Sequence, residues 1–185
     1  MIAQILEDGK ARMEEVINRT KKAFAGVRTG RANPALLDRI IVSYYGTPTP
    51  LPQMASVSVP EPRMLVITPW DKNSIKDIEK AILASDLGLV PNNDGTVIRL
   101  AIPPLTEERR KDLVRLVRKD AEDFRVAVRN IRRDLNEAAK KLEKDGEISE
   151  DELRRTQDEI QKLTDRYIEQ IDELLKVKEK EILEV

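Results

Sequence analysis

Residues 106–145, TEERRKDLVRLVRKDAEDFRVAVRNIRRDLNEAAKKLEKD, contain neither proline nor glycine, and their apolar positions recur at helical spacing. This spacing predicts one long helix with two stripes. Such a helix can bury its apolar face and present guanidinium groups to phosphates on the other face. The apolar stripe consists of Leu113, Leu116, Val117, Phe124, Val128, Ile131, Leu135 and Leu142, and the basic stripe of Lys111, Arg118, Arg125, Arg129, Arg132 and Lys140.

The basic stripe is interrupted by Glu122 and Asn136. A charged outer face on a long helix is more often a solvated surface than a binding surface. The helix by itself therefore favours the solvated interpretation, and binding to RNA needs support from the rest of the sequence.

Charge is unevenly distributed along the chain, although the net charge is only −1. Residues 1–39 and residues 107–145 each carry a net charge of +3, whereas residues 149–185 carry −5. Charged residues make up 36% of the chain and aromatic residues 3%, which favours long solvent-facing helices over a thick core. An assembly of these helices could present a basic side to a polyanion.

All ten prolines lie between Pro34 and Pro104, and this divides the chain into helical arms around a mixed insert. Residues 2–27 and 149–174 also have helical spacing, and Gly146 followed by a Ser149–Glu152 capping box separates the last two helices. The pattern predicts an α+β fold. Residues 1–29 and 106–185 form a three-helix bundle, and residues 30–105 form an inserted domain.

Within the insert, residues 40–45, 55–59, 64–68 and 96–102 read as strands, and one helix is expected to start at Ser74 and stop at Gly88. Two connections join the insert to the bundle. Gly30 and Arg31 lie in one, and Pro103 and Pro104 in the other, so a two-strand hinge is predicted. On local pattern alone, Gly30 is explained equally well as a helix stop.

Signals for catalysis are weak. The chain has no histidine and no cysteine, so the usual general base, thiol nucleophile and nitrogen or sulfur metal ligands are absent. The glycines form no phosphate-binding loop. We therefore expect no enzyme, no catalytic residue, no metal and no cofactor.

The sequence also predicts where the protein works. No stretch approaches the roughly 18 apolar residues that span a bilayer, and the first residues do not resemble a secretory signal. A cytoplasmic, monomeric protein that needs no membrane is expected. Tyr44, Tyr45 and Trp70 could stack on bases, but we expect them to be packing residues, since they lie in and beside strands.

Five runs, in the same order along the chain, resemble the signatures of the bacterial ribosome recycling factor family, and the resemblance extends over essentially the whole chain. One departure is Val90, where members of the family usually carry Asn before the proline. The runs are RTGRANP at 28–34, YYG at 44–46, SDLGL at 85–89, PPLTEERRK at 103–111 and VAVRNIRRD at 126–134.

The resemblance implies a three-helix bundle with a β/α/β domain hinged from it, in an L shape close to that of transfer RNA. It implies a protein that binds the ribosomal RNA of the large subunit after termination. With elongation factor G and GTP, such a protein splits the ribosome into subunits and releases it from messenger RNA. The alternative is a helical scaffold or chaperone-like protein that grips protein clients.

The resemblance also implies site residues. Arg129 and Arg132 fall where the family places essential ribosomal RNA contacts, and Arg28 and Arg31 match the basic run at the domain junction. Arg118 and Arg125 are added from the helical stripe alone. Lys178, on the acidic last helix, is expected to lie outside this surface, where its removal has little effect.

Overall fold

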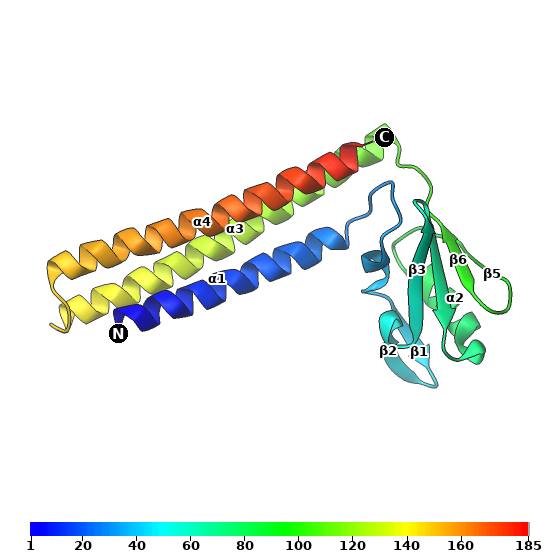
Figure 1. Cartoon of the computed structure of the whole chain (residues 1–185), viewed down its shortest axis with the longest axis horizontal. Helices are drawn as coiled ribbons and strands as arrows, with labels where there is room; N and C mark the ends of the chain where they lie inside the picture. The colour runs from blue at the N-terminus through cyan, green and yellow to red at the C-terminus, as the bar shows by residue number, and fades with distance from the viewer. Residues whose placement is uncertain (185) are drawn as a thin grey trace. The chain divides into compact units, whose positions relative to one another are not determined.

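A computed structural model describes residues 1–184, and three long helices and a small mixed domain account for most of them (Figure 1). The helices are α1 (Ile2–Ala25), α3 (Glu107–Lys144) and α4 (Glu150–Leu183). They confirm the three helices predicted from apolar spacing. The helical and sheet elements together confirm the α+β class.

Contacts divide the chain into two compact units. The bundle unit contains residues 1–24 and 114–180, and the sheet unit contains residues 25–113 and 181–184. The division therefore falls inside α3 and α4. The domain boundaries predicted after residues 29 and 105 remain predictions.

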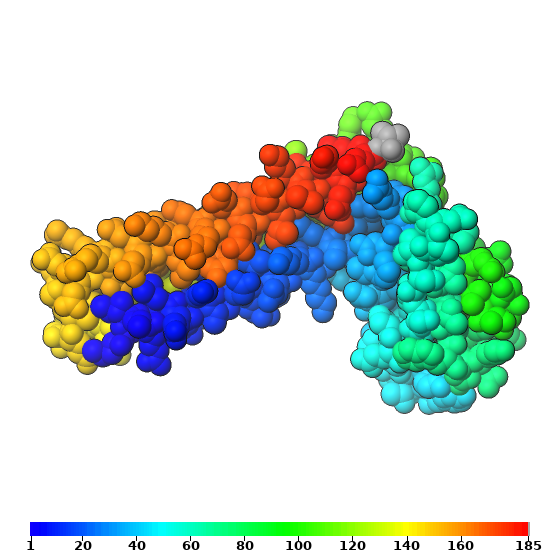
Figure 2. All heavy atoms as spheres, viewed as in Figure 1, coloured from blue at the N-terminus to red at the C-terminus, as the bar shows by residue number. Residues whose placement is uncertain are grey.

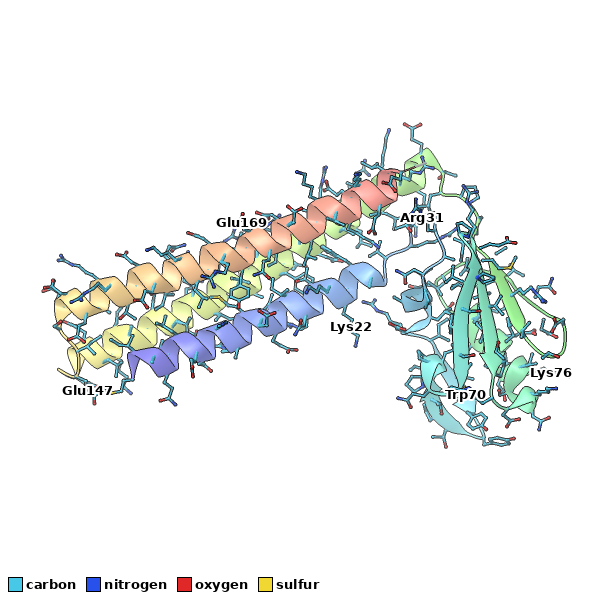
Figure 3. All side chains as sticks on the ribbon, viewed as in Figure 1. Lys22, Arg31, Trp70, Lys76, Glu147 and Glu169 are labelled. Atoms are coloured by element: carbon cyan, nitrogen blue, oxygen red, sulfur yellow. The ribbon has the colours of Figure 1, made fainter. Side chains whose placement is uncertain are left out.

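The bundle unit is held together by the apolar stripes of its three helices. The core side chains that are at most 2% exposed include Met13 and Ile17 from α1, Val128 and Leu135 from α3, and Ile160 and Tyr167 from α4. Gly9 of α1 faces Leu135 so closely that a Cβ atom would overlap its side chain. Side chains of α4 cover much of the bundle face in Figure 2, and Figure 3 shows Glu169 projecting from α4.

The turn between α3 and α4 forms as predicted. Gly146 has a φ of +75°, and the N–H groups of Gly146 and Glu147 donate to the last carbonyls of α3. The Ser149 hydroxyl then accepts from the Glu152 N–H at 3.1 Å, which caps α4. A glycine stop and the Ser149 cap thus explain the sharp reversal.

The sheet unit contains two antiparallel sheets. Strands β1 (Ile41–Tyr44) and β2 (Thr47–Pro50) form a hairpin. A second sheet has the order β3-β4-β6-β5. Its strands are β3 (Ala55–Glu61), β4 (Met64–Pro69), β5 (Pro91–Asn93) and β6 (Ile98–Ala101).

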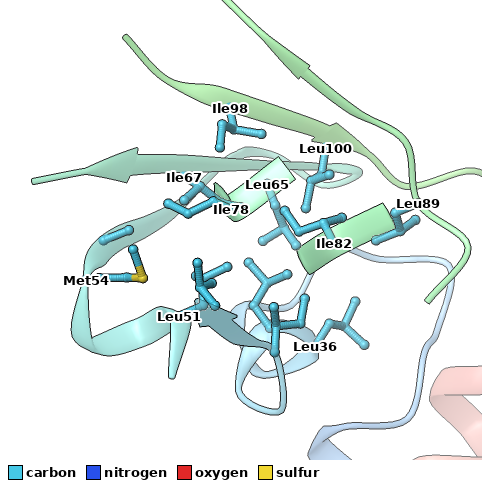
Figure 4. Packing of buried hydrophobic residues seen from close by; sticks show 14 of the residues in the cluster. Leu36, Leu51, Met54, Leu65, Ile67, Ile78, Ile82, Leu89, Ile98 and Leu100 are labelled. Carbon is cyan, nitrogen blue, oxygen red and sulfur yellow. The ribbon is translucent and has the colours of Figure 1, made fainter. Parts of the chain in front are cut away.

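One helix, α2 (Ile75–Ala84), and three short 3₁₀ turns complete the sheet unit; the turns are η1 (Pro34–Leu37), η2 (Leu51–Gln53) and η3 (Lys72–Ser74). Ile78 and Ile82 of α2 join Leu65 and Leu100 of the sheet in one buried cluster (Figure 4). These four side chains are at most 1% exposed. The unit therefore has a hydrophobic core of its own.

Strands β2 and β5 were not predicted from the sequence. Both contain proline, which lacks a ladder donor and argues against a central strand. Each pairs with one neighbour only, β2 with β1 and β5 with β6, so both are edge strands that tolerate proline.

The predicted start of α2 is confirmed, since Ser74 is its N-cap residue, but the predicted stop at Gly88 was wrong. No side-chain hydrogen bond caps the helix at Ser74, whose hydroxyl instead donates to the Asp71 carbonyl at 2.6 Å. The helix ends at Ala84, where the Ser85 N–H donates to the Ile82 carbonyl, well before Gly88. Gly88, with a φ of +67°, belongs to the following turn.

The expectation that Tyr45 and Trp70 are packing residues was also wrong. Tyr45 is 74% exposed and Trp70 69% exposed, whereas Tyr44 packs partly against the core of the sheet unit. Tyr45 and Gly46 form the two-residue β1–β2 turn with φ values of +48° and +78°. A turn of this kind matches the twist of a hairpin, and at this turn the exposed Tyr45 donates its hydroxyl to Asp71.

One prediction about a helix face failed as well: Leu116, assigned to the apolar stripe of α3, is 45% exposed. Lys178, expected to lie outside the basic surface, is only 6% exposed. Lys178 lies seven residues after Ile171 and four before Ile182, which are both fully buried. This spacing places Lys178 on the buried side of α4 despite its charge.

Candidate nucleic-acid interface

Four of the six predicted site arginines lie on α3, within the bundle unit. Arg118, Arg125 and Arg132 are seven residues apart along this helix, and Arg129 lies one turn before the last of them. Seven residues are close to two helical turns, so these side chains leave neighbouring parts of one helix face. The regular helix thus brings together the four residues predicted from its pattern.

Arg118 and Arg125 are paired with carboxylates of α4. The Arg118 Nε donates to Glu179 Oε1 at 2.6 Å, and Arg125 contacts Asp172 Oδ1 at 2.7 Å. The pairing with Glu179 raises the pKa of Arg118. Burial would lower the pKa of Arg125, but its bonds to Asp172 and Glu122 outweigh burial and raise it. These two guanidinium groups tie α3 to α4.

Arg129 and Arg132 are not paired with a carboxylate of α4 in the described chain. Arg129 Nη1 lies 3.0 Å from Glu122 Oε1, and its side chain is 39% exposed. Arg132 makes only a long contact, 3.5 Å, with the amide oxygen of Gln161, and no carboxylate within residues 1–184 pairs with it. Most of the guanidinium donors on this pair of residues are therefore available to a ligand.

Arg28 and Arg31 belong to the sheet unit and form a separate group. Arg28 Nη2 donates to the Pro103 carbonyl at 2.9 Å, while its buried Nε has no hydrogen-bond partner in the described chain. Burial and the positive charge of Arg109 lower the pKa of Arg28. Arg31 is mostly exposed and lies 3.7 Å from Glu184, a distance typical of a weak surface pair.

The four predicted hinge residues, Gly30, Arg31, Pro103 and Pro104, also lie in the sheet unit. The hydrogen bond from Arg28 to Pro103 links the two connecting stretches. Gly30 does not have a left-handed φ, and a Cβ atom there would meet nothing within 4 Å. The backbone of Gly30 therefore needs no glycine in this conformation, and the hinge remains a prediction.

Sequence reasoning missed two contributors to this chemistry. Glu122 was treated as an interruption, but its carboxylate contacts both Arg125 and Arg129. These contacts could have been predicted from the spacing, because Glu122 lies three residues before Arg125 and seven before Arg129. No role was predicted for Arg109, although its positive charge lowers the pKa of Arg28.

Other kinds of site have no support in the described part of the chain. Residues 1–184 contain no group of three acidic, histidine or cysteine side chains that could hold a metal ion. None of the helices described is both long and apolar enough to cross a bilayer. The chemistry of this surface is that of guanidinium groups in ion pairs and of free guanidinium donors, which suit phosphate ligands.

Comparison with known proteins identifies the family. The model of the family described as ribosome recycling factor matches residues 20–183. A ribosome-recycling factor of Shouchella clausii is 64% identical, and one of Carboxydothermus hydrogenoformans is 60% identical, each over the full length of both chains.

Solved structures agree. A solution structure of the ribosome recycling factor matches with a TM-score of 0.77 and 45% identity, covering 100% of this chain and 98% of that one. A second match, at 50% identity, a TM-score of 0.70 and full coverage of both chains, is the Thermus thermophilus factor in models with elongation factor G bound to the Escherichia coli post-termination complex. The chain belongs to the ribosome recycling factor family.

Proposed function

We propose that this chain binds the ribosome after termination and, with elongation factor G and GTP, splits it into subunits and releases it from messenger RNA. Family membership and the ribosome-bound relative support this proposal. The observation that carries it is the pair Arg129 and Arg132 on α3. Most of their guanidinium donors have no partner in the described chain, whereas Arg118 and Arg125 of the same helix form ion pairs with α4.

The binding step follows from the physics of structured RNA. Proteins recognise folded RNA largely through phosphates and shape, and arginine donates in a planar fork that fits a phosphate. A straight helix about 57 Å long, at 1.5 Å per residue, holds such groups at fixed intervals. Arg129 and Arg132 are the proposed central contacts, with Arg28 and Arg31 as further contacts.

The splitting step needs free energy from elsewhere. We propose that the chain acts as a non-enzymatic, monomeric factor in the cytoplasm and that the elongation factor supplies energy from its GTP. Gly30, Arg31, Pro103 and Pro104 are proposed to act as a hinge during this step. The scaffold alternative has no comparable support, because the full-length relatives are ribosome-recycling factors.

Sedimentation with purified ribosomes tests the binding step. If four or five basic side chains contact phosphates, the logarithm of affinity should fall against the logarithm of salt concentration with a slope of about −3 to −4. A flat salt response would contradict phosphate contacts. Light scattering of post-termination ribosomes with elongation factor G and GTP then tests splitting, and an unchanged signal would contradict the proposed function.

A further inference from the structure

Glu122 occupies the centre of a chain of charges that runs from α4 to the outer face of α3. Its Oε2 lies 3.0 Å from Arg125 Nη1, and its Oε1 lies 3.0 Å from Arg129 Nη1. Arg125 in turn contacts Asp172 of α4 at 2.7 Å. Four side chains of alternating sign are thus connected in the order Asp172, Arg125, Glu122 and Arg129.

The two arginines at Glu122 differ in their surroundings. The Arg125 side chain is 19% exposed and contacts carboxylates on two helices, so its position is well defined. Arg129 is 39% exposed, and within residues 1–184 it contacts Glu122 alone, through Nη1. The position of the Arg129 guanidinium therefore depends on Glu122, and the position of Glu122 depends on Arg125.

A carboxylate at this place has two opposite effects on binding to RNA. Its negative charge repels phosphates, which weakens binding. Its hydrogen bond to Arg129 fixes a long side chain that otherwise has several rotatable bonds, and this removes part of the entropy cost of ordering Arg129 on a ligand. The bond uses Nη1 and leaves Nη2 and Nε free to donate to a phosphate in a fork.

We propose that Glu122 is a positioning residue for RNA binding, which holds the guanidinium of Arg129 in the orientation that receives a phosphate. The inference rests on the proposed function, because it assigns Glu122 a part in ribosome binding. It predicts a change in ribosome affinity opposite in sign to the change expected from total charge. Removing the negative charge of Glu122 weakens binding, although it makes the surface more basic.

The test compares Glu122→Gln with Asp123→Asn. Both substitutions remove one negative charge from the same turn of α3, but Asp123 is exposed and makes no contact with an arginine in the described chain. Ribosome affinity is measured by sedimentation for the unmodified chain, both variants, Arg129→Ala and the double variant Glu122→Gln with Arg129→Ala. Melting temperatures of all five proteins check that the bundle remains folded.

Glu122→Gln is expected to lower affinity severalfold at an unchanged melting temperature, whereas Asp123→Asn leaves affinity equal or slightly higher. In the Arg129→Ala background, Glu122→Gln is expected to cause no further loss, because its effect passes through Arg129.

Three results would overturn the inference. Glu122→Gln could bind as well as Asp123→Asn, or it could cause the same loss with and without Arg129, or its loss could follow a lower melting temperature. A failure of the unmodified chain to bind ribosomes would instead overturn the proposed function, and with it this inference.

Discussion

At the scale of single residues, four arginines of one helix have different surroundings. Arg118 and Arg125 are paired with carboxylates of α4, whereas Arg132 reaches only an amide oxygen. The sequence predicted the stripe, because the helical period alone places these side chains on one face. It could not predict their partners, because these depend on how α3 and α4 are aligned along their lengths.

The first prediction concerns Arg129 and Arg132, the two arginines of this group that pair with no carboxylate of α4 in the described chain. Arg132→Ala and Arg129→Ala should each weaken ribosome binding by roughly 1 to 3 kcal/mol, since each removes donors to a phosphate. Thermal unfolding should change little, because neither side chain is in the core. Sedimentation with ribosomes measures the affinity, and circular dichroism measures the melting temperature.

Lys176→Ala is the matched control for these two substitutions. Lys176 is an exposed cation of α4 with no hydrogen bond or ion pair in the described chain. It serves better as a control than Lys178, which is buried. Equal losses from the control and the two arginine variants would mean that total charge, not a defined surface, governs binding.

A second residue-scale prediction concerns Asp71, which accepts from the hydroxyls of Tyr44 and Tyr45 and from the Asn73 N–H. The Asn73 N–H and the two hydroxyls lower the pKa of Asp71, so its carboxylate stabilises the fold above the ordinary value of 3.8. This contribution is lost as the pH falls through the lowered pKa. The bonds to Asp71 raise the pKa of both tyrosines, so their contribution is lost only as the pH rises above 10.

Asp71→Asn should therefore lower the melting temperature of the sheet unit at pH 7, and the difference from the unmodified chain should shrink as the pH falls below about 4. Thermal unfolding at a series of pH values measures this difference. Asp86→Asn, at an exposed position without a hydrogen bond or ion pair in residues 1–184, is the control. A difference that stays constant down to pH 2 would show that the charge of Asp71 is not involved.

At the scale of elements, long helices were predictable and short strands were not. The three bundle helices repeat their apolar spacing over many turns, and a glycine and a capping box mark the turn between two of them. Strands β2 and β5 have three or four residues with proline, so their existence depends on pairing with β1 and β6. Both partners are neighbours in sequence, but whether such short segments pair depends on how they pack within the sheet unit, which local pattern does not contain.

The close approach of α1 and α3 gives an element-scale prediction. Alanine in place of a helical glycine ordinarily stabilises a protein by about 0.5 to 1 kcal/mol. At Gly9 the added Cβ would overlap Leu135, which is 2% exposed and has little room to move. Overpacking of this kind costs about 1 to 3 kcal/mol. Gly9→Ala should therefore fail to stabilise the bundle and should destabilise it by up to about 2 kcal/mol in urea unfolding.

A double variant identifies the cause. Leu135→Ala removes the overlapping side chain, so Gly9→Ala should be less harmful, or even favourable, in that background. Stabilisation of the otherwise unmodified chain by about 1 kcal/mol would contradict a tight contact between the helices at Gly9.

At the scale of the whole molecule, composition and charge predicted less than the signature motifs did. The basic stripe on α3 was compatible with a solvated face, and only the resemblance to a family assigned it to ribosomal RNA. Physical reasoning explains why Arg129 and Arg132 suit phosphates. It does not explain from this chain alone why binding would separate subunits, because that step involves partners. Motif and structure differ at Gly30. Its motif predicts a hinge, but its observed conformation does not require glycine.

The last prediction tests whether the freedom of Gly30 is used during splitting. In the observed conformation alanine fits, because the φ of Gly30 is not left-handed and the space around a Cβ is empty. Gly30→Ala should therefore keep ribosome affinity and keep or raise stability by about 0.4 to 1 kcal/mol. If splitting takes Gly30 through positive φ, alanine adds about 1 to 2 kcal/mol to that step, and the rate falls about 5- to 30-fold. Light scattering with saturating factor and elongation factor G measures the rate separately from affinity. A normal splitting rate at full occupancy would mean that the reaction never takes Gly30 into conformations that alanine resists, and the proposed hinge would then have to depend on other residues.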